Sequence, residues 1–138
     1  MSNWFKSVGS KNLVIALDTE KDVSISLDES SIIRGKDLHG TVVISYPGRF
    51  DSVVINSQIE NSSDVFSYTS LNGKSIKHPY ARLSIFKSEL GGKTTLGFTA
   101  TTTHTPSKEY SNAKFRVSII QEHKEVVSDI AFTKILKA

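Results

Sequence analysis

The four histidines are the side chains of this sequence best suited to bind a metal or to move a proton near neutral pH. A local zinc site needs two ligands at a short spacing, such as i and i+4. No two histidines are that close, and the chain contains no cysteine. We therefore predict no metal site, no cysteine-based catalysis, and histidines that lie apart at turns or on the surface. They are His39, His78, His104 and His123, and His104, beside Pro106 at an expected strand end, is of most interest.

Serine is abundant, but its sequence contexts do not indicate a nucleophile. The G-x-S-x-G turn of α/β-hydrolases is absent. Nothing in the spacing gathers an acid, a base and a nucleophile near one strand end, although such groups can converge when a chain folds. We predict that the protein is not an enzyme and has no catalytic residues and no cofactor. An enzyme remains our third hypothesis.

Gly92-Lys93-Thr94 has the ending of a phosphate-binding P-loop. The full motif needs a glycine five residues before Gly92, where this chain has Lys87, and a helix after it. The residues that follow alternate as a strand does. We therefore predict a hairpin turn here.

Two groups of acidic residues lie near the first expected strands, and their carboxylates are oxygen ligands of the kind that Ca²⁺ prefers. Their spacing does not resemble an EF-hand loop, and Lys21 offsets part of the charge of the first group. We expect solvated acidic surfaces, with a weak cation site as the alternative. The groups are Asp18, Glu20 and Asp22, followed by Asp28 and Glu29.

Trp4, Phe5 and Lys6 are the residues that we single out for partner binding. Trp4 is the only tryptophan and lies in residues 1–11, which we expect to be a flexible leader. Aromatic rings beside a cation are typical of protein and membrane interfaces. The alternative is that the leader folds back and its rings cover an open end of the domain, which solubility favours.

Length and charge limit the classes of protein that this chain can be. Its 138 residues are enough for one domain, which can bury a core without disulfides or metal. The formal net charge is +3, but basic residues are scattered among acids and no long block of one sign appears, so we expect no specific nucleic-acid binding. No apolar run is long enough to span a membrane, and no signal peptide is recognisable, so we expect a cytoplasmic protein.

Polar and apolar residues alternate along most of the chain, which is typical of strands with one buried face. Examples are Val23–Leu27 and Thr95–Thr101. Turn signals such as Asn72-Gly73 separate these segments. The pattern predicts about eight or nine strands, the first at residues 13–17, in an all-β, antiparallel β-sandwich that forms a single domain over residues 12–138.

The order of these segments resembles the arrestin-like domain superfamily. A strand at residues 23–27 leads to an apolar residue, the spacing Gly35…Gly40, and a further strand up to Ile44. Later, residues 96–100 lead through Thr105-Pro106-Ser107 to a strand at 114–120 and a last strand that ends near Ile135. The resemblance covers roughly residues 12–137, and residues 1–11 are similar to the opening of the bacterial sporulation-control proteins of this superfamily.

This resemblance implies an immunoglobulin-like β-sandwich that acts as a scaffold or adaptor and does no chemistry. Two-domain arrestins sense phosphates through a charged core between two sandwiches. This chain has room for one sandwich, so no phosphate-sensing residues are carried over.

We expect a non-catalytic, cytoplasmic module that binds another protein through sheet edges or loop ends, with a homo-oligomer also possible. The alternative is a sandwich that binds a small ligand or a membrane surface through the acidic loops or the aromatic leader, although membrane binding is the less favoured part of that reading.

Overall fold

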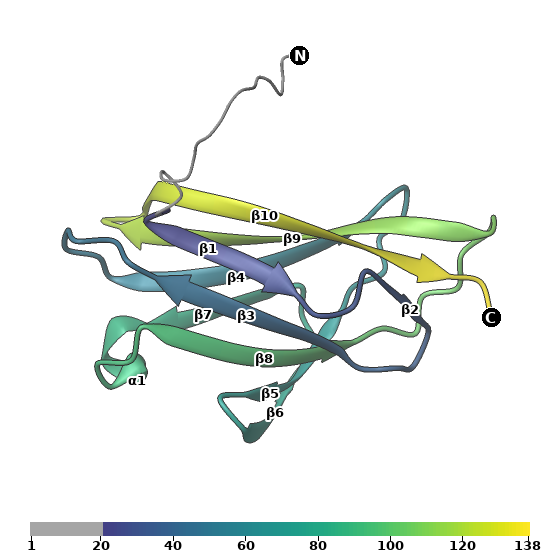
Figure 1. The fold of residues 1–138 in the computed structure, drawn as a ribbon, viewed down its shortest axis with the longest axis horizontal. Coiled ribbons are helices and arrows are strands. Elements are labelled where there is room, and N and C mark those ends of the chain that lie inside the picture. The colour runs from purple at the N-terminus through teal and green to yellow at the C-terminus, as the bar shows by residue number, and fades with distance from the viewer. Residues whose placement is uncertain (1–20) are drawn as a thin grey trace, which may run out of the picture.

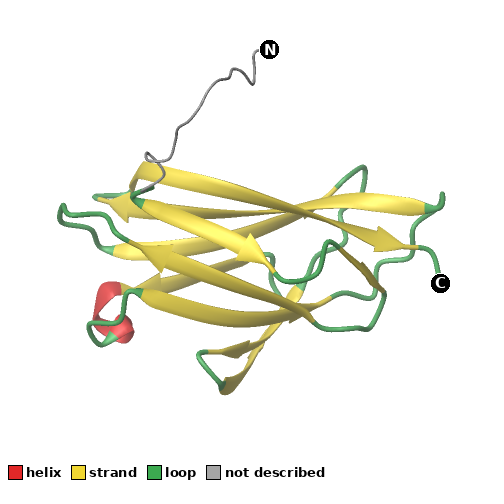
Figure 2. Ribbon diagram, viewed as in Figure 1, coloured by secondary structure: helices red, strands yellow, loops and turns green. Residues whose placement is uncertain are grey.

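The computed structural model describes residues 21–138, which form two β-sheets packed face to face (Figures 1 and 2). The first strands are β1 (Val23–Leu27), β2 (Ser31–Ile33), β3 (Leu38–Ile44), β4 (Ser52–Ile59) and β5 (Ser67–Leu71). They are followed by β6 (Lys74–His78), β7 (Arg82–Phe86), the short helix α1 (Lys87–Leu90), β8 (Thr95–Thr101), β9 (Tyr110–Gln121) and β10 (Lys124–Leu136). No helix within residues 21–138 has the length and apolar character needed to cross a membrane.

Each sheet contains five strands. Sheet 1 has the order β1-β3-β8-β5-β6, and sheet 2 has the order β2-β10-β9-β4-β7. Neighbouring strands are antiparallel, except that β2 runs parallel to β10. This architecture confirms the predicted all-β sandwich.

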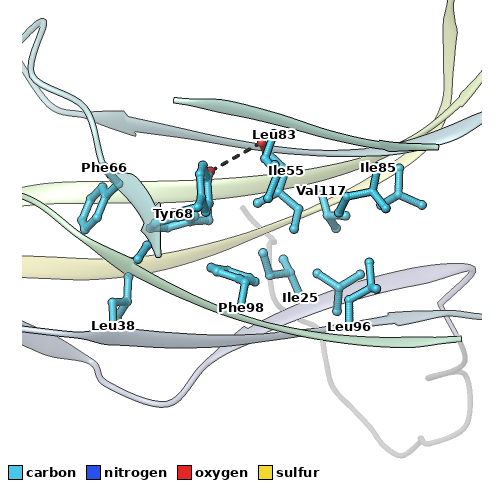
Figure 3. Packing of buried hydrophobic residues seen from close by; sticks show 14 of the residues in the cluster. Ile25, Leu38, Ile55, Phe66, Tyr68, Leu83, Ile85, Leu96, Phe98 and Val117 are labelled. Carbon is cyan, nitrogen blue, oxygen red and sulfur yellow. Dashed lines mark hydrogen bonds between the residues drawn. The ribbon is translucent and has the colours of Figure 1, made fainter. Parts of the chain in front are cut away.

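The core fills the space between the sheets and follows the predicted alternation. Along β3 and β8, buried residues alternate with more exposed ones. Figure 3 shows side chains of both sheets pointing into the same layer. Residues of this core include Leu38, Val42, Leu96, Phe98, Val53, Ile55, Phe115, Val117 and Ile119.

Gly40 is required because an aromatic ring occupies the space where a side chain would lie. Gly40 of β3 pairs with Phe98 of β8. A Cβ on Gly40 would lie 2.2 Å from Cζ of Phe98. The second glycine of the Gly35…Gly40 spacing therefore allows the Phe98 ring to cross the neighbouring strand.

Four aromatic rings join the two sheets in the middle of the core. The rings of Phe66 and Phe115 have centroids 4.9 Å apart, and those of Tyr68 and Phe98 are 5.9 Å apart. The Tyr68 hydroxyl donates a hydrogen bond to the carbonyl of Ala81 at 2.8 Å. Burial raises the pKa of the Tyr68 phenol far above its usual value. Tyr68 is therefore a neutral core residue.

The described chain has ten strands, more than the eight or nine expected for the whole sequence. Two of these strands lack a clear pattern. β2 has only three residues, and β6 has the sequence KSIKH with no apolar alternation. Both are held by neighbours, β2 by β10 and β6 by β5. The expected strand at residues 13–17 and the expected leader lie outside the described residues.

Two turn predictions had different outcomes. Asn72 and Gly73 have φ values of 50° and 80° and join β5 to β6, as the predicted hairpin requires. The hairpin predicted at Gly92-Lys93-Thr94 is wrong, because β7 belongs to sheet 2 and β8 to sheet 1. Instead, the chain passes from one sheet to the other through helix α1 and the two glycines after it. Gly91 and Gly92 both have positive φ values.

Candidate functional site

Two loops meet at the end of the sandwich where the chain finishes, on the right in Figure 1. Residues 60–66 join β4 to β5, and residues 102–109 join β8 to β9. Together with the start of β9 they surround a hollow of about 570 Å³. Its lining includes Glu60, Ser62, His104, Lys108, Glu109 and Ser111.

His104 is the central side chain of this site. It is buried, and both of its ring nitrogens have partners. Nδ1 lies 2.7 Å from Oδ2 of Asp64, and Nε2 lies 2.9 Å from Oγ of Ser111. The three side chains therefore form a carboxylate–imidazole–hydroxyl relay, the arrangement that serine hydrolases use.

The surrounding loop backbone holds this relay in place. Buried Thr102 donates its hydroxyl to the carbonyl of Val65 at 3.0 Å and accepts the His104 N–H at 3.1 Å. The Ser62 hydroxyl accepts the Asp64 N–H at 2.9 Å. The hydrogen bond with His104 lowers the pKa of Asp64, and a bond from Ser62 contributes in the same direction. Asp64 is thus a carboxylate at neutral pH, although more than half of its side chain is exposed.

The rest of the lining is polar and carries more acid than base. The Asn112 amide donates to Oε1 of Glu60 at 3.0 Å. Glu109 and Lys108 line the same hollow, and the ring of Tyr110 beside them has the Lys134 ammonium 4.4 Å from its centroid. This end of the sandwich therefore combines exposed charges with an aromatic ring.

Sequence reasoning identified His104 but not its partners. Asp64 lies 40 residues before His104 and Ser111 lies seven residues after it. The spacing in the sequence gathers no acid, base and nucleophile near one strand end and leaves convergence by folding open; in the structure Asp64, His104 and Ser111 meet at the start of β9. No local spacing signals the convergence, because the Asp64 loop arrives from a different pair of strands.

The other three histidines lie apart from His104, as expected. His39 Nδ1 is 2.7 Å from Oε2 of Glu29, His78 Nε2 is 2.6 Å from the carbonyl of Arg82, and His123 lies in the turn between β9 and β10. Within residues 21–138, no group of three or more His, Cys, Asp or Glu side chains is arranged to hold a metal ion.

Glu29, from the second acidic group, uses both carboxylate oxygens on His39. Oε1 accepts the His39 backbone N–H at 2.7 Å, and Oε2 contacts the ring. Burial opposes ionisation of Glu29, but these two bonds outweigh it and lower the pKa of the carboxyl group. The bond with Glu29 raises the pKa of His39. Asp18 and Glu20, like Trp4, Phe5 and Lys6, lie outside the described residues.

The edges of both sheets carry groups that hinder the addition of another strand. At β1, the Ile25 N–H donates to Oδ2 of Asp129 at 3.0 Å. At β7, the Phe86 N–H donates to Oε1 of Glu89 at 2.8 Å, and the Arg82 carbonyl accepts from His78. Strand β6 carries Lys74 and Lys77 and pairs with β5 through an irregular register, and β2 is only three residues long.

Comparisons with known proteins give a fold but no family. No protein-family model matches the chain, and no curated protein is significantly similar to it. A solved structure of a conjugative transposon lipoprotein from Bacteroides eggerthii is similar over 84% of this chain and 98% of that chain, with 8% identity and a TM-score of 0.50. The human F-spondin reeler domain is similar over 86% of this chain and 90% of its own, with 11% identity and a TM-score of 0.44. At these identities the likeness concerns the β-sandwich fold alone.

Proposed function

We propose that this protein is a cytoplasmic interaction module that binds another protein through the loop end around His104. The observation that carries this proposal is the contrast between the sheet edges and the loop end, the two surfaces through which we expected a partner to bind. Edge strands β1 and β7 are capped by the side chains of Asp129 and Glu89. The loop end is open, hollow and cross-linked by His104.

A pre-formed loop end suits recognition because little conformational entropy is lost on binding. His104 connects the two loops and β9 through Asp64 and Ser111. The exposed carboxylate of Glu109 favours a partner segment that presents a basic side chain, whereas the Tyr110 ring beside it already holds the Lys134 ammonium of this chain.

The relation to arrestin-like domains is part of the same proposal. This relation is supported by Gly35 and Gly40, the two glycines of the arrestin-like spacing. Gly35 has a φ of 82° in the turn before β3, and Gly40 leaves room for Phe98. The backbone at position 35 and the packing at position 40 therefore both favour glycine, the residue type that the arrestin-like pattern has at these two places.

The test is affinity capture from lysate of the source organism at low and high salt, followed by mass spectrometry. We expect one or a few proteins to be retained at high salt. Charge reversal at the loop end, Glu109→Lys, should release them. The matched control, Asp22→Lys, reverses an exposed charge before β1 at the opposite end of the sandwich and should retain them.

A heterogeneous catch that disappears at high salt would contradict the proposal, because it would show that the mild positive charge was collecting polyanions. An identical catch with both variants would contradict the loop-end assignment.

A further inference from the structure

We propose that Ser111 is a reactive nucleophile, activated by His104 and Asp64, which transfers acyl groups from small esters that enter the loop-end hollow. The inference does not depend on the proposed binding partner. It rests on the in-line order Ser111 Oγ, His104 Nε2, His104 Nδ1 and Asp64 Oδ2, with contacts of 2.9 Å and 2.7 Å.

The order of these atoms decides which proton can move. Asp64 is ionised and accepts from Nδ1, which fixes the neutral imidazole with its proton on Nδ1. Nε2 then carries the lone pair and accepts from the Ser111 hydroxyl. This is the tautomer that a general base requires, and the distance between Nε2 and Oγ is within the range for proton transfer.

Substrate access is provided by the hollow itself. Ser111 is only partly buried and lines the hollow of about 570 Å³. This volume lies within the range of small-ligand pockets, roughly 300–1,000 Å³. Lys108 lines the same hollow and is the residue available to donate to a developing oxyanion. We assign a short-chain carboxylic ester as the class of substrate, because acyl transfer is the reaction that a Ser–His–Asp arrangement performs and the hollow has room only for a small molecule.

The reaction is ester hydrolysis in two steps. Oγ of Ser111 bonds to the acyl carbon while its proton passes to His104 Nε2, and the ester C–O bond then breaks as Nε2 returns that proton to the leaving alcohol. Water next gives a proton to Nε2 and attacks the acyl carbon. The bond to Oγ breaks, Oγ regains the proton, and the carboxylic acid leaves.

In this reaction His104 and Ser111 act on the substrate, whereas Asp64 is a positioning residue. Ser111 is the second residue of strand β9 and pairs with Ile135 of β10. The strand holds the nucleophile on a rigid element, and His104 and Asp64 reach it from the β8–β9 and β4–β5 loops.

The experiment labels the full chain with a fluorophosphonate probe, which forms a serine O–P bond and releases fluoride. We expect one label on Ser111, located by peptide mass spectrometry. Ser111→Ala should lose it, and His104→Gln should slow it by roughly 100-fold or more, the usual contribution of a general base. Ser107→Ala removes a hydroxyl from the same hollow and should retain labelling of Ser111.

The positioning role of Asp64 has its own readout. In Asp64→Asn we expect slower labelling of Ser111 at an unchanged melting temperature, with part of the rate restored in Asp64→Glu, whereas a purely structural role would lower the melting temperature together with the rate.

A second pair of variants tests the idea without relying on the serine label. Because the chain contains no cysteine, Ser111→Cys and Ser107→Cys each introduce the only thiol. The thiol at position 111 should react with iodoacetamide faster, and at lower pH, than the thiol at 107, since His104 favours the thiolate. Equal reactivity of the two thiols, or an unlabelled wild-type Ser111 in the folded protein, would overturn the proposal.

Discussion

His104 can keep both of its ring hydrogen bonds in either protonation state. The Ser111 hydroxyl can rotate to donate to neutral Nε2 or to accept from the protonated ring, while Asp64 accepts from Nδ1 in both cases. The connection between the two loops therefore does not depend on which of these two forms the ring takes. The second carboxylate–imidazole pair, Glu29 and His39, differs because it lies on the surface and its histidine has one ring partner there.

The Glu29–His39 pair makes a pH-dependent contribution to stability. Glu29 raises the pKa of His39 in the folded state. While Glu29 is ionised, the contribution is therefore fully present below the unfolded-state pKa of histidine, about 6.5, and it is lost as pH rises through the folded-state pKa of His39. NMR titration should show the His39 pKa decrease in Glu29→Gln, while Glu60→Gln, a carboxylate elsewhere, should leave it unchanged. An unchanged His39 pKa in Glu29→Gln would show that the pair does not exist in solution.

Gly40 tests the close contact with Phe98. Gly40→Ala places a Cβ against the Phe98 ring and should destabilise the protein by about 1–3 kcal/mol, the usual cost of overpacking a core. Gly97, on the neighbouring strand, has no atom within 4 Å of its Cβ position, so Gly97→Ala is the matched control and should have little effect. Urea unfolding measures both. Adding Phe98→Leu should recover part of the loss, and equal effects at the two glycines would contradict this account.

At the scale of elements, one edge strand of each sheet, β1 in sheet 1 and β7 in sheet 2, is capped by side chains from outside that strand. Asp129 of β10 covers β1, while His78 and Glu89 on either side of β7 cap its outward-facing groups. Unpaired edge groups are templates for self-association, and natural sandwiches block them in similar ways. The edges of this protein are thus adapted to remain free of added strands.

Removing the caps of β7 should expose that edge. In a double variant, His78→Ala with Glu89→Ala, the Phe86 N–H and the Arg82 carbonyl lose their partners. We expect the mass-average size from light scattering to increase with concentration more steeply than in the wild type. Glu60→Ala, at the loop end, controls for the lost charge. The same concentration dependence in all three proteins would show that the caps do not protect the edge.

For the molecule as a whole, the two sheets are joined through the aromatic centre of the core. Phe115 belongs to sheet 2, and its ring packs against Phe66, Tyr68 and Phe98 on the side of sheet 1. These contacts connect segments that are distant in sequence. They make the sandwich one cooperative unit rather than two separate sheets.

Truncation of this ring should have a large global effect. Phe115→Ala removes a fully buried ring and should reduce the free energy of unfolding by about 3–5 kcal/mol. Phe132, on the neighbouring strand, is 69% exposed, so Phe132→Ala should change stability by no more than about 0.5 kcal/mol. Chemical denaturation followed by circular dichroism compares the two, and similar losses would contradict the assignment of Phe115 to the core.

The sequence by itself determined the class of fold, because burial on one face of a strand requires a two-residue period that can be read directly. The alternation along residues 95–101 and the Asn72-Gly73 turn predicted elements that the structure contains. Strands β2 and β6 were not predictable, since their pairing partners rather than their own residues hold them in place.

Only the tertiary structure decided where the candidate site lies. Asp64, His104 and Ser111 have no periodic relation, and they meet because β4, β8 and β9 end or begin at the same end of the sandwich. It likewise decided that the chain crosses between sheets after Gly91-Gly92, where local residues indicated a hairpin. Local patterns record which face of a strand is buried, whereas the meeting of distant loops depends on strand order, which no local pattern encodes.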